Sequence, residues 1–209
     1  MNPAIVAYVK LPDQLPPQAA AQLRAAVPYG RRMRLAPEGD TASASLLGMA
    51  LARVLLAQMH GTSPASIPLQ FPYRSKPFSP GRAHFSLSHS GQWLAGIACA
   101  SARVGLDIEV RTPAAAALAG AGRDLGDWTA REAVVKARGS GLVQINEVQV
   151  HEAYCLCQHE RWYLMRPAVP AGLIAAVVSE QPLALSVRSV SWESLITPAD
   201  NPQPEAASA

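Results

Sequence analysis

The sequence predicts an α+β fold, and two kinds of pattern support this class. Short segments that alternate apolar with polar residues, bounded by turn residues, predict strands, whereas longer apolar or amphipathic segments predict helices. Helical turns are expected at residues 17–26, a long helix at 42–59 and a shorter helix at 129–138. Strands are expected at residues 5–10, 83–89, 93–100, 104–110, 146–156, 161–166, 172–178 and 184–190. Proline-rich linkers occupy residues 64–80.

The long helix expected at residues 42–59 is apolar over most of its length. Arg53 interrupts it, and it is shorter than the about 20 uninterrupted apolar residues of a membrane span. We therefore expect a helix of the protein core and no membrane partner.

Composition sets wider limits on the function. A chain of 209 residues can bury a sizeable core, as one domain or two small ones. The net charge of +3 is mild and no long basic run occurs, so nucleic acid is not an expected partner. Three cysteines without a disulfide or metal-ligand pattern suit a reducing cytoplasm, and residues 1–13 do not predict a signal peptide.

The strand expected at residues 104–110 carries two carboxylates. Side chains of a strand alternate between its faces, so Asp107 and Glu109 share one face while Leu106 and Ile108 share the other. The Cα atoms of the two acidic residues lie about 6.6 Å apart, close enough for both side chains to bind one Mg²⁺. A half-exposed strand whose outer face simply carries charge explains the pair equally well.

The helix expected at 129–138 adds a carboxylate and a lysine. Thr129 and Glu132 match a capping box, and Gly139 suits the end of the helix. Glu132 and Lys136 are four residues apart on one face, which also fits a surface ion pair worth about 0.2 to 0.5 kcal/mol. However, Lys136 is one of only three lysines, against fifteen arginines, and Lys76 lies in another polar motif.

That further motif combines hydroxyl groups, an imidazole and a lysine. Lys76 and Pro77 precede the segment His84-Phe-Ser-Leu-Ser88-His89, which reads as a short strand that runs into a turn. Such groups at a strand end suit the binding of phosphate oxygens. The alternative for His89 is a solvent-exposed histidine of a turn.

Taken in order, these motifs resemble those of the surfactin-synthetase-type 4′-phosphopantetheinyl transferases. The motifs are Ser-Lys76-Pro, Phe-Ser-Leu-Ser88-His-Ser, Val-Gly-Leu-Asp107-Ile-Glu and Trp128-Thr-Ala-Arg-Glu-Ala-Val-Val-Lys. The likeness extends from near the N-terminus to about residue 196. It implies an enzyme that transfers the phosphopantetheine arm of coenzyme A to a serine of an acyl or peptidyl carrier protein, with Mg²⁺ on the pyrophosphate and 3′,5′-ADP as the other product.

The resemblance also implies roles for individual residues. Asp107, Glu109 and Glu132 would be the metal-site acids, Glu132 would also accept the proton of the serine hydroxyl, and Lys136 would neutralise the pyrophosphate. Asp107 and Lys136 would contact coenzyme A as well. The residues that would bind the rest of coenzyme A are Ser88 and His89 at its 3′-phosphate, Lys76 and Pro77 at the nucleotide, Ser45, and Arg31 or Arg32.

The family resemblance implies two similar α+β subdomains related by a pseudo-twofold, with the active site in the cleft between them. Residues 1–103 would form the nucleotide side, and residues 104–197 would carry the metal site and catalytic helix. Residues 198–209 are polar and proline-rich and are expected to be disordered. Between Asp107 and the catalytic helix, residues 112–122 predict a loop or one short helix. The expected enzyme is a cytoplasmic monomer.

Two other functions are compatible with the same residues. A metal-dependent hydrolase could use the acids to cleave a nucleotide pyrophosphate without any carrier. A non-catalytic protein could bind coenzyme A or a carrier through the same groups.

Overall fold

The computed structural model describes residues 1–32, 35, 39–72, 75–81, 83–115 and 124–196. It has a mixed α+β fold with two sheets. The first sheet has the strand order β2 (His84–Ser90), β3 (Trp93–Cys99), β1 (Asn2–Lys10) and β9 (Leu183–Ser189). The second sheet has the order β4 (Val104–Val110), β8 (Leu173–Ser179), β7 (Glu160–Met165), β6 (Tyr154–Cys157) and β5 (Val148–Val150).

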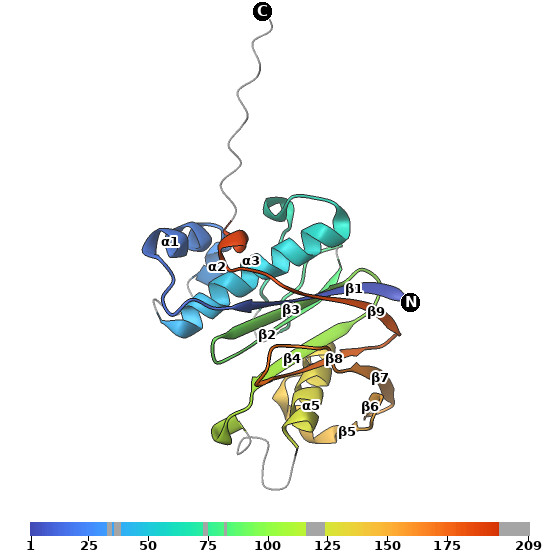
Figure 1. Ribbon diagram of the computed structural model, residues 1–209. Coiled ribbons are helices and arrows are strands. Elements are labelled where there is room, and N and C mark those ends of the chain that lie inside the picture. Colours follow the sequence, from blue (N-terminus) through green and yellow to red (C-terminus); the bar gives the residue numbers. More distant parts are fainter. Residues whose placement is uncertain (33–34, 36–38, 73–74, 82, 116–123, 197–209) are drawn as a thin grey trace, which may run out of the picture.

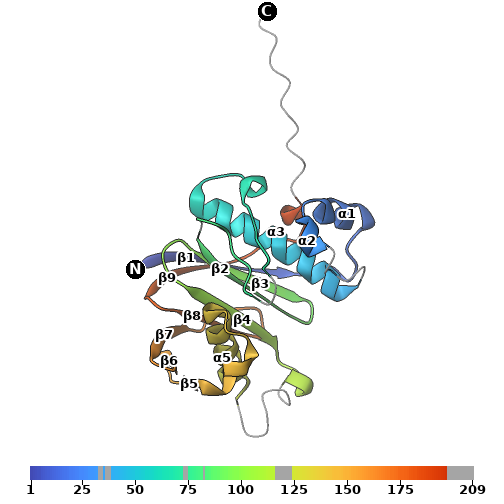
Figure 2. The same ribbon diagram turned by 180° about the vertical axis from the view of Figure 1, so that it is seen from behind.

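The two sheets lie face to face, with a long helix on the outer side of each (Figure 1). Helix α3 (Asp40–His60) covers the first sheet, and α5 (Leu125–Arg138) covers the second. The short helices α1 (Pro17–Ala25) and α2 (Tyr29–Arg32) lie beside α3, as the view from behind also shows (Figure 2). Three short 3₁₀ helices span Pro64–Ser66, Leu142–Glu147 and Glu193–Leu195.

Three large apolar clusters fill the spaces between these layers, and a smaller one contains Leu125 and Ile174. The cluster between α3 and the first sheet contains Leu47, Leu51 and Leu55. The cluster between the sheets joins Val6 and Ile97 to Leu106. The cluster under α5 is built around the fully buried Trp162. Helix α3 is long and apolar enough to cross a membrane, but its most apolar window is 67% buried in the protein, as expected for a core helix.

The start of α5 differs from the sequence prediction. The helix begins at Leu125 instead of residue 129, and the N-cap is Asp124, whose side chain accepts a hydrogen bond from the Gly126 N–H. Thr129 is fully buried inside the helix, and its hydroxyl donates to the Leu125 carbonyl. The predicted capping box was therefore wrong, because Asp124 already satisfies the first turn and a threonine can bond backward along the helix.

The strand expected at 146–156 was also wrong as a single element. Residues 142–147 form a 3₁₀ helix, and a turn at 151–153 separates β5 from β6, which pair antiparallel to each other. The 64–80 linkers contain a second 3₁₀ helix and an isolated bridge between Gln70 and Phe78.

The chain passes from the first sheet to the second between β3 and β4, where the boundary near residue 103 was expected. It returns at β9, which pairs in parallel with β1 in the first sheet, and Leu195 then packs in the cluster beneath α3. In the predicted 112–122 segment, residues 113–115 form a helical turn, and the remainder from 116 lies outside the described residues, as does the expected tail at 198–209.

Candidate active site

Helix α5 is seated directly on β4, and Gly105 makes this close approach possible. A Cβ atom at Gly105 would lie 1.9 Å from the Ala133 carbonyl oxygen and 2.8 Å from the Ala137 nitrogen. Any side chain at this position would push the helix backbone away from the strand. The glycine therefore sets the distance between Asp107 on β4 and the polar face of α5, which carries Glu132 and Lys136.

Asp107 is the most buried charged residue of the described chain, with 1% exposure. Its Oδ1 atom lies 2.5 Å from the Lys136 Nζ and accepts a hydrogen bond of 2.6 Å from the Ser88 hydroxyl. Lys136 also donates to the Ser88 Oγ at 2.8 Å. Three side chains from β2, β4 and α5 thus meet at one carboxylate oxygen, and the reading of Asp107 as an exposed strand charge is wrong.

Glu132 is directed to the same ammonium group from α5. Its Oε2 lies 3.9 Å from the Lys136 Nζ, and its side chain is 18% exposed. Burial, together with the negative charges of Asp107 and Glu109, raises the pKa of Glu132 to about 6, against the opposing charge of Lys136. The neighbouring Trp128 side chain, one turn earlier, also opposes the rise in this pKa. Glu132 is therefore ionised at neutral pH but is a stronger base than a solvated glutamate.

Glu109 lies farther along β4 and is half-buried. Its Oε2 accepts a hydrogen bond of 2.7 Å from the Ser90 hydroxyl, which in turn accepts from the Val110 N–H at 3.0 Å. Burial raises the pKa of Glu109, and the bond from Ser90 opposes this change. The charge of Asp107 also raises the pKa of Glu109, and the charge of Glu109 raises the pKa of Glu132. The three carboxylates therefore interact electrostatically.

The arrangement can be tested for its fit to a divalent cation. Within the part of the chain that the structure describes, no group of three or more His, Cys, Asp or Glu side chains is already arranged to hold a metal. Instead, the partner of the Asp107 carboxylate is Lys136, and that of the Glu109 carboxylate is Ser90. However, Asp107 Oδ2 is buried and has no hydrogen-bond partner there. An unpartnered carboxylate oxygen is unfavourable unless something binds it, and oxygen ligands suit Mg²⁺.

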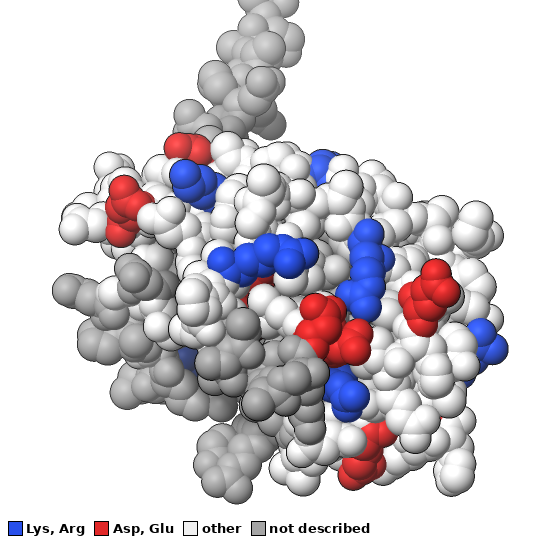
Figure 3. All heavy atoms as spheres, turned by 60° about the horizontal axis from the view of Figure 1, so that its bottom comes forward, with Lys and Arg blue, Asp and Glu red and all other residues white. Residues whose placement is uncertain are grey.

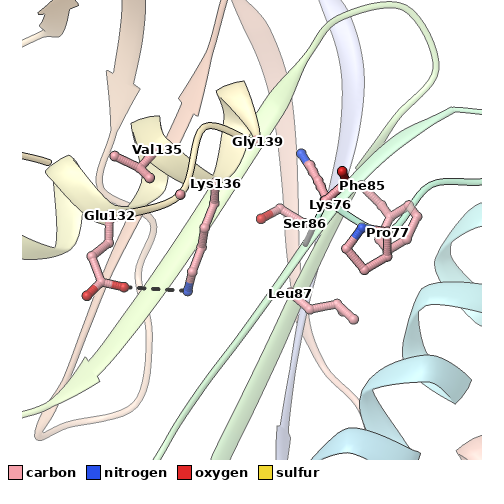
Figure 4. Close-up of a pocket in the computed structure, with 11 residues that line it drawn as sticks. Lys76, Pro77, Phe85, Ser86, Leu87, Glu132, Val135, Lys136 and Gly139 are labelled. Atoms are coloured by element: carbon pink, nitrogen blue, oxygen red, sulfur yellow. Dashed lines mark ion pairs between the residues drawn. The ribbon is translucent and has the colours of Figure 1, made fainter. Parts of the chain in front are cut away.

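A cavity of about 460 Å³ opens beside Glu132 and Lys136. Figure 4 shows these two side chains on α5 facing Lys76, Pro77 and Ser86 across the opening. Its remaining lining is mainly apolar and comprises Ser75, Phe85, Leu87, Val135, Gly139 and Gly141. The volume lies within the usual range for ligand pockets.

Lys76 is brought to this cavity by a short closed loop. Residues Gln70 and Phe78 exchange two backbone hydrogen bonds of 2.8 and 3.1 Å, which fix the loop that carries Lys76. The Lys76 ammonium donates to the Val104 carbonyl at 3.0 Å, at the start of β4. Burial, followed by the charge of Arg103, lowers the pKa of Lys76 to about 8. An anionic ligand would favour its charged form.

Ser88 and His89 lie on opposite faces of β2. Ser88 is directed to β4, where its hydroxyl contacts Asp107. His89 is exposed, and burial of part of its ring together with the charge of Lys136 lowers its pKa. It shares a face with Leu87, which lies under Gly48 of α3, and the half-buried Ser45 is one turn before that glycine.

The two arginines at the end of α2 have local contacts. Arg32 donates to the backbone carbonyls of Ala25 and Val27 at 3.2 and 3.0 Å, at the end of α1. The Arg31 guanidinium lies 5.4 Å from the centre of the Phe71 ring. Neither arginine lines the cavity beside Glu132, so their assignment to coenzyme A stays a prediction.

Sequence reasoning missed three residues that build this site. Ser86 and Ser90 flank Ser88 on the same face of β2, and Gly105 seats α5. The sequence contains a signal for the two serines. Serines occur at every second position from 86 to 90, which places them on one face of a strand, as for Asp107 and Glu109. On the face shown in Figure 3, acidic side chains lie directly beside basic ones near the middle of the molecule.

No protein-family model matches the sequence, and no curated protein matches it either. The function is therefore inferred from the residues and their geometry.

Proposed function

We propose that the protein is a Mg²⁺-dependent 4′-phosphopantetheinyl transferase that acts on acyl or peptidyl carrier proteins as a cytoplasmic monomer. The observation that carries this proposal is the convergence of Asp107 and Glu132, from two separate segments, on the ammonium of Lys136. This group lies at the rim of a cavity that also contains Lys76. One acid and two lysines line this cavity, and the carboxylate of Asp107 lies against Lys136. Such a combination of charges suits a pyrophosphate substrate.

The charges support phosphoryl transfer in particular. This reaction needs positioned reactants and neutralisation of phosphate charge more than it needs covalent help from the protein. Lys136 and Lys76 provide positive charge on two sides of the cavity. Carboxylates alone would repel the substrate, so Asp107, Glu109 and Glu132 make chemical sense if a divalent cation joins them. Bound there, Mg²⁺ would neutralise the pyrophosphate oxygens.

In the proposed reaction, the serine oxygen of the carrier attacks the phosphorus that bears the pantetheine group. The bond from this phosphorus to the bridging pyrophosphate oxygen breaks, and 3′,5′-ADP leaves. Glu132 accepts the serine proton, for which its pKa of about 6 suits it. Lys136 holds the orientation of Asp107 and Glu132, and Lys76 and Pro77 bind the nucleotide.

The proposal extends to the symmetry of the fold. Each half has a sheet with one long helix on its outer face, α3 on the first and α5 on the second. A pseudo-twofold axis between the sheets would relate these halves and place the cavity at their junction. The lining supports this placement, because Phe85 and Leu87 come from the first sheet and Glu132 and Lys136 from α5.

The decisive experiment incubates the purified protein with coenzyme A, Mg²⁺ and a panel of apo carrier proteins. We expect intact-protein mass spectrometry to show one phosphopantetheine added to a carrier serine, and none in excess chelator. Glu132→Gln should lower the rate by roughly 100- to 10,000-fold while leaving coenzyme A binding intact. Glu160→Gln is the matched control, because Glu160 is an ion-paired glutamate outside the cavity.

Each alternative predicts a different result. Free phosphopantetheine without a modified carrier would identify a pyrophosphate hydrolase. Coenzyme A binding without turnover on any carrier, together with an unchanged affinity in Glu132→Gln, would identify a non-catalytic binder. Full activity in chelator would contradict the proposed role of the carboxylates.

A further inference from the structure

A second, smaller cavity lies on the other side of Lys76. Its volume is about 230 Å³, and Lys76 and Pro77 line it as well as the larger cavity. Its other polar lining comes from Ser79, His84 and Arg103. None of these three lines the larger cavity, and the proposed transfer reaction uses none of them.

Ser79 is the residue that most needs an explanation. It is 6% exposed, and its hydroxyl has no hydrogen-bond partner within the described residues. Buried hydroxyl groups are almost always hydrogen-bonded, because leaving one unsatisfied costs about 1 to 3 kcal/mol. A ligand in the cavity that this side chain lines would provide the missing partner.

The charges around the cavity indicate the sign of that ligand. His84 is an exposed residue, but partial burial of its ring, followed by the positive charge of Lys76, lowers its pKa, so the neutral ring can still donate one N–H. Arg103 is held by Glu180 at 2.7 Å and by Glu160 at 2.9 Å, which fixes its position and offsets its charge. The donors left to a ligand are therefore the Lys76 ammonium, the His84 ring and the Ser79 hydroxyl, which together suit one carboxylate.

The remaining lining indicates an apolar body of limited size. Phe85 is buried, whereas Phe78 is 45% exposed, so one ring is still open to be covered. A protein cavity of about 150 Å³ accepts benzene. A volume of about 230 Å³ therefore has room for one ring and a carboxylate.

We propose that this cavity binds a small aromatic carboxylate of the size of benzoate. Its carboxylate is held by Ser79, His84 and Lys76, and its ring lies against Phe78. The site does not depend on the proposed transferase activity. Because Lys76 lines both cavities, a bound carboxylate would also compete for this ammonium with an anionic ligand in the larger cavity.

Titration calorimetry of the full chain with benzoate at pH 7, without coenzyme A or Mg²⁺, tests the proposal. We expect saturable binding of benzoate, at least tenfold weaker binding of the neutral benzyl alcohol, and at least tenfold weaker binding of inorganic phosphate, which lacks the ring. Ser79→Ala and His84→Ala should each weaken benzoate binding at least fivefold. His159→Ala, which changes an exposed histidine in the turn before β7, is the matched control.

Thermal unfolding of each variant shows whether the fold is retained, and Phe78→Ala adds a surface variant that leaves the buried lining intact. Weaker benzoate binding in Phe78→Ala supports the site. The proposal is overturned if the parent does not bind benzoate saturably, or if folded Ser79→Ala and His84→Ala bind it as the parent does. Glu132→Gln should bind benzoate normally, so failure of this site and failure of the proposed transferase are separate results.

Discussion

Two clusters of ionised side chains lie on the second half of the molecule, and they differ in how their carboxylates are satisfied. The inner cluster is Asp107, Glu132 and Lys136, and the outer cluster is Arg103, Arg138, Glu160 and Glu180. In the outer cluster, each carboxylate oxygen has a nitrogen atom of an arginine within 2.9 Å. In the inner cluster, Asp107 Oδ2 is buried and makes no hydrogen bond. Glu160 Oε2 in the outer cluster makes no hydrogen bond either, but it lies 2.7 Å from the Arg138 Nη1.

Burial separates Asp107 from the acidic residues of the outer cluster, whereas Lys136 at 31% exposure and Glu180 at 30% are alike. The side chains of Arg103 and Glu160 are 41% and 38% exposed, whereas that of Asp107 is 2% exposed. Exposed ion pairs contribute little to stability, typically about 0 to 1 kcal/mol, while a buried charge is costly unless it is fully paired. The ion pairs of the outer cluster therefore join β7, β8 and α5 with little desolvation. The inner cluster contains a buried carboxylate with an unpaired oxygen, which is unfavourable for stability and is expected of a binding site.

The largest effect is expected from Gly105→Ala, which acts on the seat of the inner cluster. The new methyl group would meet the Ala133 carbonyl, so α5 must move away from β4. We expect a loss of about 3 kcal/mol or more in the free energy of unfolding, measured by urea denaturation. Gly48→Ala is the control, because its methyl group would meet Leu87 and Leu94 at an ordinary 3.6 Å. Equal losses in both variants would show that α5 is not seated as described.

A smaller but more selective effect is expected from Lys136→Met. This change leaves Asp107 buried and without its cation. We expect a loss of about 2 kcal/mol in the free energy of unfolding, less than for a fully buried pair because the Lys136 side chain is 31% exposed. Arg103→Met, which opens two exposed ion pairs, should cost about 1 kcal/mol. The double variant Asp107→Asn and Lys136→Met should recover part of the loss. If the two single variants were equally destabilised, the contrast between the clusters would not hold.

Lys76 lines one cavity with Lys136 and another with Arg103, and its ionisation predicts that binding depends on pH. Its pKa is lowered to about 8, chiefly by burial. Phosphate groups bind the charged form, so affinity is highest below pH 8 and is lost as pH rises above it. We expect 3′,5′-ADP to bind about tenfold more weakly for each further unit of pH. Calorimetry from pH 7 to pH 9.5 checks this, and Lys76→Arg, which stays charged, should give a flat profile.

Much of the inner cluster could be predicted from the sequence because it depends on local periodicity. The alternation at 104–110 placed Asp107 and Glu109 on one face, and the structure confirms that the opposite face, with Leu106 and Ile108, enters the core. The spacing of four residues also placed Glu132 beside Lys136, as the distance of 3.9 Å confirms. The assignment of a metal to these acids stays a prediction.

Contacts between distant segments could not be predicted in this way. Ser88 and Ser90 meet Asp107 and Glu109 because β2 and β4 lie side by side in different sheets, and no local pattern encodes that register. The parallel pairing of β1 with β9, near the two ends of the described chain, could not be predicted from local patterns either. Gly105 was visible in the sequence, but its role depends on a helix that approaches from elsewhere.

The smallest effect is expected where the sequence prediction of a cap was wrong. Thr129 was the expected cap of α5, whereas the structure has Asp124 at the N-cap and Thr129 inside the helix. Asp124→Ala should therefore cost about 1 kcal/mol in the free energy of unfolding, since the Gly126 N–H loses its acceptor. Asp127→Ala is a matched control in the same turn, whose half-exposed carboxylate pairs only loosely with Arg166 at 3.5 Å. Urea denaturation measures both losses, and a larger loss in Asp127→Ala would show that the helix begins elsewhere. Because Glu132 lies two turns inside α5, we expect the folded Asp124→Ala variant to keep the proposed carrier modification at nearly the parent rate.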